Sequence, residues 1–320
     1  YIYWSPIGKI DEKIFIDDEF YELFSSSVNY RLESDVPVAN FLSGGLDSSS
    51  IIKNLFDNNK DINTFSAIYS DKKYDESLWI ESVKEKYQTN HIQEKLDLNL
   101  DFETLLEVIN VFDEPYCDPS IIPSYMLSRS ISKEYKVAIS GDGGDELLGG
   151  YIRTSLSLNE PNMFKSLYSN IYSFYPSFLG TGNHFLKNKR SISDRYASFF
   201  EDRKLMSIIG IDDYSEFKNE IFVNLEDEYK SLLATDYNFY LPEMMMLKVD
   251  RTSMANSLEV RSPFVDHRLI EYVMSHDTNY FDTTNQKLLL KKYLSDDFND
   301  DFINRRKMGF VFNLESFIFS

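Results

Sequence analysis

The sequence contains a single cysteine, Cys117, among its 320 residues. No disulfide can form within the chain, and a metal site built from several thiolates is excluded. A cytoplasmic location is the default expectation for such a chain. The longest uncharged stretch, residues 166–186, is rich in Ser, Asn and Tyr and contains Pro176, so we expect no membrane span and no membrane partner.

Basic residues are also scarce, with 33 Lys and Arg against 52 Asp and Glu and a formal net charge of −19. This balance argues against a broad electrostatic surface for nucleic acid, so no nucleic-acid partner is expected. It does not argue against a small anionic substrate held by a few local cations. The length and the 42% apolar content suit one large domain or two domains with a substantial core.

A glycine-containing turn, Ser43-Gly44-Gly45-Leu46-Asp47-Ser48, lies between the apolar run Val36–Leu42 and the helical pattern Ser49–Phe56. Two glycines allow the backbone to turn tightly, and the start of a helix offers unpaired N–H groups that favour an anion. A carboxylate beside a polyphosphate usually holds Mg²⁺, which gives Asp47 a function. The turn is not a Walker motif, which would need Gly-Lys-Ser/Thr. An ordinary glycine turn is the alternative.

A second loop, Ser140-Gly141-Asp142-Gly143-Gly144-Asp145-Glu146, follows the short apolar stretch Lys136–Ile139. Its glycines and carboxylates suit neither a core nor a helix, but they suit a strand-end loop that binds a nucleotide and provides a second Mg²⁺ ligand. In an open parallel sheet, ligands bind beyond the carboxyl ends of the strands. We therefore expect the two loops to meet at one crevice.

Strand-like and helix-like segments alternate after a first predicted helix, Asp17–Arg31. This order predicts the α/β class, with a parallel twisted sheet, helices on both faces, and a mainly helical part following it. The predicted organisation is a linker over residues 1–16, an α/β core over 17–150 and a helical part over 151–320 that completes the active site. The alternating segments are Val36–Leu42, Ser48–Phe56, Ile62–Tyr69, Glu76–Tyr87, His91–Leu96, Phe102–Val111, Ile121–Glu134 and Lys136–Ile139.

Three further stretches combine with the two loops into a recognisable pattern. They are Asp113–Ser120, the pair Lys248–Ala255 and Ser257–Asp266, and Arg305-Arg306-Lys307-Met308-Gly309-Phe310. From about Trp4 to Phe310, the chain resembles the synthetase domain of glutamine-dependent asparagine synthetases. These belong to the ATP pyrophosphatase (PP-loop) superfamily, and the resemblance implies its adenine nucleotide alpha-hydrolase-like fold.

The resemblance implies a reaction in two steps. Aspartate attacks ATP to give β-aspartyl-AMP and pyrophosphate, and ammonia then displaces AMP to give asparagine. ATP is thus the implied co-substrate and Mg²⁺ the implied metal. The implied roles are pyrophosphate binding by Ser43, Gly44, Gly45, Asp47 and Ser48, Mg²⁺ binding by Asp47 and Asp145, adenosine contacts by Leu42, Ala67, Ser140 and Gly141, and catalysis by Asp142 and Lys307.

The chemistry is consistent with these roles. Adenylation places negative charge on the α-phosphate while pyrophosphate leaves, which calls for Mg²⁺, backbone donors and a lysine. Ammonia attack needs a carboxylate that accepts a proton, for which Asp142 is the first candidate and Glu259 the second. Glu259 could instead pair with Arg251 or Arg261. These two arginines could themselves bind the substrate carboxylate.

The sequence departs from the family at its start, because no residue matches the N-terminal cysteine of a glutaminase domain. Either that domain lies outside this chain or free ammonia is the nitrogen donor, and a homodimer is left open. Relatives use the same scaffold as amidotransferases for other carboxylates or to close β-lactam rings. The ring-closing relatives have tyrosine where this chain has Asp142, which favours asparagine. A non-catalytic nucleotide-binding module is the alternative of a different class.

Overall fold

The computed structural model describes residues 3–5, 13–69, 76–96, 102–116, 118–159, 191–200, 208, 210 and 215–305. The chain forms two compact units, each assembled from separate stretches of sequence. The sheet unit comprises Ile16–Gly144, Glu243–Ile270 and Leu289–Ser320, and the helical unit comprises Tyr1–Phe15, Asp145–Pro242 and Glu271–Leu288. A single boundary near residue 150, as the sequence predicts, does not describe this interleaved division.

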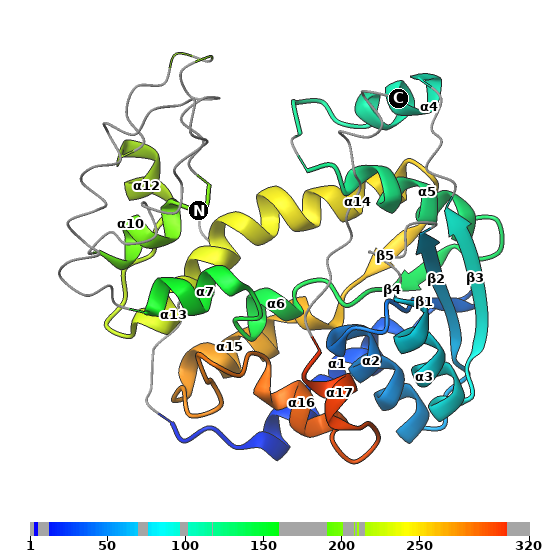
Figure 1. The fold of residues 1–320 in the computed structure, drawn as a ribbon, viewed down its shortest axis with the longest axis horizontal. Coiled ribbons are helices and arrows are strands. Elements are labelled where there is room, and N and C mark those ends of the chain that lie inside the picture. Colours follow the sequence, from blue (N-terminus) through cyan, green and yellow to red (C-terminus); the bar gives the residue numbers. More distant parts are fainter. Residues whose placement is uncertain are drawn as a thin grey trace. The chain divides into compact units, whose positions relative to one another are not determined.

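The sheet unit contains five parallel strands in the order β3-β2-β1-β4-β5 (Figure 1). The chain adds β2 and β3 on one side of β1 and then returns to place β4 on the other side. This reversal puts the carboxyl ends of β1 and β4 side by side, with Asn40 opposite Ile139. The strands are β1 (Val38–Phe41), β2 (Asn63–Tyr69), β3 (Asn90–Leu96), β4 (Val137–Ile139) and β5 (Glu259–Arg261).

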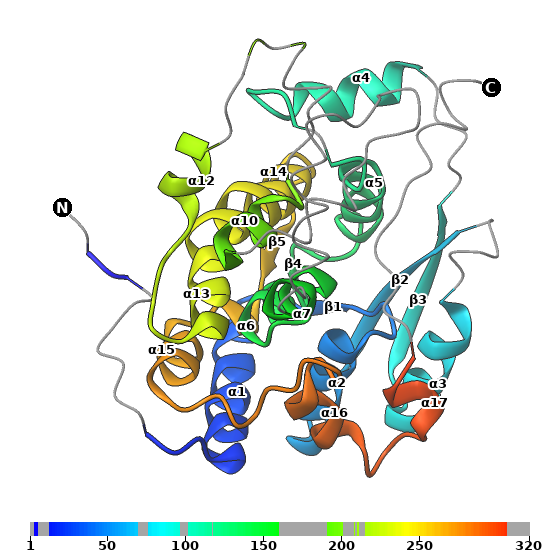
Figure 2. The same cartoon turned by 60° about the vertical axis from the view of Figure 1, so that its left-hand side comes forward.

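Helices cover both faces of the sheet, as Figures 1 and 2 show. Helix α2 contacts α1, α3 and β1, whereas α5 contacts β2, β3 and α14. The parallel α/β class expected from the sequence is therefore confirmed. The helices of this unit are α1 (Asp17–Arg31), α2 (Leu46–Asp57), α3 (Ser77–Tyr87), α4 (Phe102–Asn110), α5 (Ile121–Ile131), α14 (Leu247–Met254), η5 (Pro263–Val265) and α17 (Asp300–Ile303). Helix α16 (Leu288–Leu294) also belongs to this unit except for its first residue.

The core of the sheet unit forms where the central strands are covered on both sides. All three residues of β4 are buried, and Ala39, Phe65 and Ala138 pack with Leu127 and Ile131 of α5. Such continuous apolar strands are typical of parallel sheets, because neither face meets water. The predicted runs Val36–Leu42 and Lys136–Ile139 contain β1 and β4, and each strand is slightly shorter than its run.

The fifth strand, β5, is missing from the sequence-based prediction, which makes residues 151–320 mainly helical. Its Val260 pairs with Ala138 of β4. The strand has only three residues, and two of them, Glu259 and Arg261, are charged. It is defined by its partner strand rather than by a local apolar pattern.

The helical unit is built around α7 (Ile152–Leu158), which contacts both α10 and α13. Its interior contains an ion pair in which Arg153 Nη2 lies 2.9 Å from Asp236 Oδ1, with the Tyr196 hydroxyl donating to the same oxygen. No helix in the described part of the chain is both long and apolar enough to cross a bilayer. The other helices here are α10 (Ile192–Ala197), α12 (Ser215–Ile221) and α13 (Glu228–Thr235), and α6 (Gly144–Leu147), η4 (Asp236–Met246) and α15 (His267–Ser275) extend across the division.

A buried carboxylate, Asp266, fixes the segment that supports the second loop. Its Oδ2 lies 2.5 Å from Arg31 Nη1 and 2.8 Å from Arg268 Nη2, and its side chain is only 4% exposed. The N–H group of Arg268 also donates to Oδ1. Although burial opposes ionisation, these bonds hold the pKa of Asp266 below its usual range.

Replacing this carboxylate by the Asp266→Asn substitution should lower the free energy of unfolding by about 2 to 3 kcal/mol, because two cations lose a buried partner. A lowered pKa stabilises the fold above the unfolded value and loses that effect as pH falls through the folded value. The difference from wild type in urea unfolding should thus be constant at neutral pH and shrink below about pH 4. Glu107→Gln, which breaks an exposed pair with Arg129, is the control and should have little effect. Equal unfolding midpoints for Asp266→Asn and wild type would contradict this account.

Candidate active site

The first loop connects the end of β1 to the start of α2. The N–H group of Leu42 donates to the carbonyl of Phe65, and α2 begins at Leu46 after Gly45 in an extended conformation. Within the loop, the N–H group of Gly45 donates to Ser43 Oγ at 3.2 Å, and Ser43 Oγ lies 3.2 Å from Ser48 Oγ. The first amide groups of α2 have no acceptor within the helix, so this end favours an anion.

Gly44 must be glycine, because its φ of +68° lies in the left-handed region. A Cβ at this position would lie 2.8 Å from Trp79 Cβ and 2.9 Å from the backbone nitrogen of Ile80. The loop is therefore pressed directly against the first turn of α3.

The second loop follows β4 and is held by the segment around β5. The N–H group of Ser140 donates to the carbonyl of Arg261 at 2.9 Å, and the Ser262 hydroxyl donates to the carbonyl of Asp142. These bonds fix the backbone of Asp142 and leave its carboxylate out of them. The Ser140 hydroxyl is buried and makes no hydrogen bond within the described chain, so it could serve a ligand.

The two loops meet at Asp47, as expected from the sequence. A Cβ on Gly141 would lie 2.9 Å from Asp47 Cβ, and a Cβ on Gly144 would lie 2.4 Å from Asp47 Oδ1. The meeting point lies where the strand order reverses, between β1 and β4, which is where open α/β sheets bind their ligands. Asp145 is the next residue in the chain after Gly144.

In the helical unit, Asp145 is paired with Lys287. The Lys287 Nζ lies 2.8 Å from Asp145 Oδ1, and the lysine side chain is 6% exposed. The neighbouring Glu146 is buried, accepts a hydrogen bond from the Tyr151 hydroxyl, and has a pKa raised to about 7 by burial. Lys287 lies in no motif, so local sequence carries no signal of this pairing.

A cation from the C-terminal motif reaches the first loop. Arg305 follows α17 and donates from Nη2 to the carbonyl of Gly44. Lys307, the predicted catalytic lysine, lies outside the described residues, as does Cys117.

The remaining predicted residues lie elsewhere in the sheet unit. Glu259 and Arg261 pair with each other at 2.7 Å, and Arg261 also donates to the carbonyls of Arg31 and Glu33. Glu259 is opposite Val137, at the amino end of β5, whereas the loops follow the carboxyl ends. This geometry favours the ion-pair alternative for Glu259. Arg251 of α14 pairs with the exposed Asp113 at 2.7 Å, and Ala67 lies in β2.

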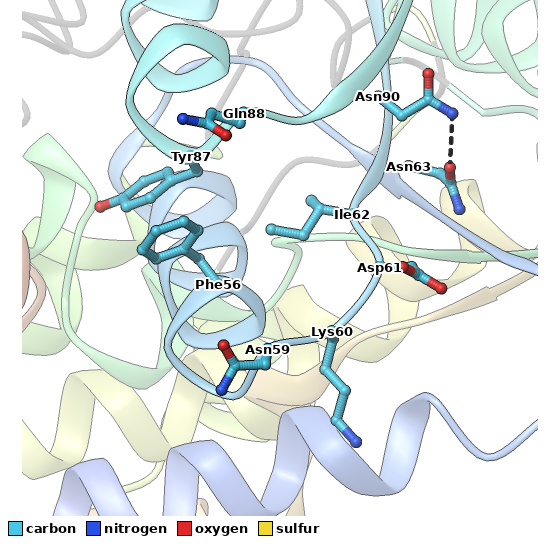
Figure 3. Close-up of a pocket in the computed structure, with 9 residues that line it drawn as sticks. All are labelled: Phe56, Asn59, Lys60, Asp61, Ile62, Asn63, Tyr87, Gln88 and Asn90. Atoms are coloured by element: carbon cyan, nitrogen blue, oxygen red, sulfur yellow. Dashed lines mark hydrogen bonds between the residues drawn. The ribbon is translucent and has the colours of Figure 1, made fainter.

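A surface hollow of about 650 Å³ lies away from these loops (Figure 3). It opens at the amino ends of β2 and β3, beside the last residues of α2 and α3, and the Asn90 amide donates to Asn63 Oδ1 across one side. The hollow contains none of the predicted site residues. Its lining residues are Phe56, Asn59, Lys60, Asp61, Ile62, Asn63, Tyr87, Gln88 and Asn90.

The donor set at the loops fits Mg²⁺ bound together with a polyphosphate. Mg²⁺ prefers hard oxygen ligands and is usually held by one or two carboxylates plus phosphate oxygens and water. Asp47 provides such a carboxylate at the start of α2. Within the described residues, no group of three or more His, Cys, Asp or Glu side chains could hold a metal by itself.

Comparison with known proteins gives a consistent result. The family model for asparagine synthase matches residues 19–317. The chain is 28% identical over 326 residues to asparagine synthetase [glutamine-hydrolyzing] 1 of Bacillus subtilis, covering 96% of this chain and 51% of that protein. It is 40% identical over 157 residues to a putative asparagine synthetase of Methanocaldococcus jannaschii, covering 48% of this chain and 30% of that protein. The chain spans about half the length of the Bacillus subtilis relative.

The contact between Gly144 and Asp47 can be tested by substitution. Gly144→Ala should weaken binding of Mg²⁺-ATP at least about tenfold, because the new methyl group must displace the Asp47 carboxylate. Calorimetric titration with ATP and Mg²⁺ measures the effect, and urea unfolding checks the fold. Glu107→Gln, at an exposed ion pair of α4, is the control and should bind as wild type does. Unchanged affinity in folded Gly144→Ala would show that the position of Asp47 does not matter for binding.

Proposed function

The chain belongs to the asparagine synthase family, and on that premise we propose that it converts aspartate to asparagine with ATP, through β-aspartyl-AMP. The observation that carries the proposal is the meeting of the two loops at Asp47, where the strand order reverses. Because the chain spans about half of its first relative, the nitrogen source of the whole protein is part of the proposal.

In the first half-reaction, an aspartate β-carboxylate oxygen attacks the α-phosphorus of ATP, and the bond to the pyrophosphate oxygen breaks. Ser43, Ser48 and the first amides of α2 would bind the departing pyrophosphate. Asp47 and Asp145 would hold Mg²⁺, which neutralises charge on the phosphate oxygens when bound. Lys307 would supply a further positive charge near the α-phosphate, as the family resemblance implies.

The adenosine of ATP would lie along the carboxyl edge of the sheet. Leu42 follows β1 directly and Ala67 lies in the adjacent β2, so both occupy this edge. Ser140 and Gly141 follow β4 on the other side of β1. The unpaired, buried hydroxyl of Ser140 supports this placement, because a buried polar group without a partner is costly.

In the second half-reaction, ammonia attacks the acyl carbon, a proton is removed from the nitrogen, and AMP leaves with the electron pair of its bond. We assign Asp142 as the proton acceptor, since its backbone is fixed by Ser262 and its carboxylate belongs to the loop that meets Asp47. Glu259 and Arg261 receive no role in this mechanism because they pair with each other. Arg251 stays a candidate for binding the substrate carboxylate.

Ammonia would come from glutamine if a glutaminase domain accompanies this chain, and from free ammonium otherwise. The relatives named above as glutamine-hydrolysing support the first source. We also propose a cytoplasmic location, on the basis of the single cysteine.

The proposal predicts that the protein releases pyrophosphate from Mg²⁺-ATP when aspartate is present, and forms asparagine when ammonium is added. Asp47→Ala should reduce pyrophosphate release at least about a hundredfold, because it removes a Mg²⁺ ligand. Asp142→Ala should retain nucleotide binding and stop asparagine formation. Coupled pyrophosphate detection and mass spectrometry of asparagine measure the two steps.

Asp57→Ala provides a matched control, because this aspartate ends α2, is 44% exposed and pairs with Lys53 at 3.4 Å. Full asparagine synthesis by Asp142→Ala would exclude Asp142 as the proton acceptor. If pyrophosphate were released with another carboxylate but not with aspartate, the adenylation reaction would stand and aspartate would be excluded as the substrate. ATP binding without turnover of any carboxylate would instead support a nucleotide-binding module.

A further inference from the structure

Arg305 lies 261 residues from Gly44 in the chain, yet its guanidinium is buried against the first loop. The side chain is 10% exposed, and that of its partner Glu76 is 17% exposed. Nη1 lies 3.5 Å from Glu76 Oε1, while Nη2 donates to the carbonyl of Gly44. The guanidinium carbon also lies 5.1 Å from the ring centre of Trp79, within reach of a cation–π interaction.

Burying the charged Arg305 and Glu76 side chains costs free energy that a contact between apolar side chains would not. Burial raises the pKa of Glu76 to about 7, against the effect of Arg305. Burial likewise lowers the pKa of Arg305, against the attraction of Glu76 and Asp47. A guanidinium remains charged under these conditions. Its two terminal nitrogens are directed at protein acceptors, so the group is arranged to hold protein atoms rather than to receive a ligand.

The atom that Arg305 holds controls the geometry of the loop. The carbonyl of Gly44 and the N–H group of Gly45 belong to one planar peptide unit and point in opposite directions. Fixing the oxygen therefore also fixes the N–H group, which donates to Ser43 Oγ. Ser43 Oγ in turn lies 3.2 Å from Ser48 Oγ. Gly44 has no side chain to restrict this peptide, so an external contact must define its orientation.

We propose that Arg305 and Glu76 form a clamp on the Gly44–Gly45 peptide that sets the first loop in its pyrophosphate-binding conformation. We call these two side chains, with the Gly44 carbonyl, the Arg305 clamp. Arg305 is thus a positioning residue that acts through the loop. The inference rests on the proposed function, because that function identifies the anion as the pyrophosphate portion of ATP.

Arg305→Met removes the charge and retains the hydrophobic stem against Trp79. The KM for ATP and the inhibition constant for pyrophosphate should each rise at least about tenfold, because the loop must be ordered when the ligand binds. The KM for aspartate should change less than about twofold. A purely structural role would instead lower the urea midpoint without separating the two KM values.

Arg305→Lys and Glu76→Gln distinguish the clamp from a direct contact with phosphate. A single ammonium lacks the fork that reaches both Gly44 and Glu76, so Arg305→Lys should recover little of the lost affinity. Glu76→Gln should add no further loss to Arg305→Met, because both substitutions break one unit. Strong rescue by lysine together with additive losses would overturn the clamp and indicate direct phosphate binding.

The matched controls are Lys84→Met and Glu81→Gln, which remove the members of a 2.6 Å pair on α3. They remove the same kinds of charge from the middle and last turn of that helix, away from its first turn against the loop, so both should bind ATP and pyrophosphate as wild type does.

Calorimetric titration of each protein with Mg²⁺-pyrophosphate and Mg²⁺-ATP separates the clamp from the proposed function. Wild type that binds both ligands but turns over no carboxylate would reject the proposed function alone. Arg305→Met that binds both as tightly as wild type would reject the clamp alone. Wild type that binds neither ligand would overturn both.

Discussion

The pairing of β1 with β4 is the constraint on which the candidate site depends. These strands are parallel and adjacent, so the loops that follow them leave the sheet at the same edge. The close approach of Gly141 and Gly144 to Asp47 is possible only because neither residue has a side chain. The sheet thus determines where the loops meet, and the glycines determine how closely.

The charge distribution explains how an acidic chain could bind an anion. The chain has a net charge of −19, and a cation beside each loop is paired with a carboxylate. Arg305 is held by Glu76 at the first loop, and Lys287 is paired with Asp145 after the second. The amides at the start of α2 would then attract an anion at the first loop, because at short range they act more strongly than distant surface carboxylates, which salt screens.

Much of the fold could be predicted because parallel α/β units carry strong local signals. The helix expected over Asp17–Arg31 is α1, and the ends of the first four strands lie within two residues of the predicted ones. Both loops were identified because glycine and carboxylate residues cluster after apolar runs. The strand β5, the contact of Arg305 with Gly44 and the pairing of Lys287 were missed, because each depends on a partner far away in the sequence.

The late arrival of β5 also has a consequence for biosynthesis. Residues 140–258 separate it from β4, so a ribosome completes β4 long before the chain contains its neighbour. During that interval the outer edge of β4, with the apolar residues Val137, Ala138 and Ile139, has free hydrogen-bonding groups. An exposed strand edge of this kind can pair with another chain, so a form that ends before residue 259 would be prone to aggregate through β4.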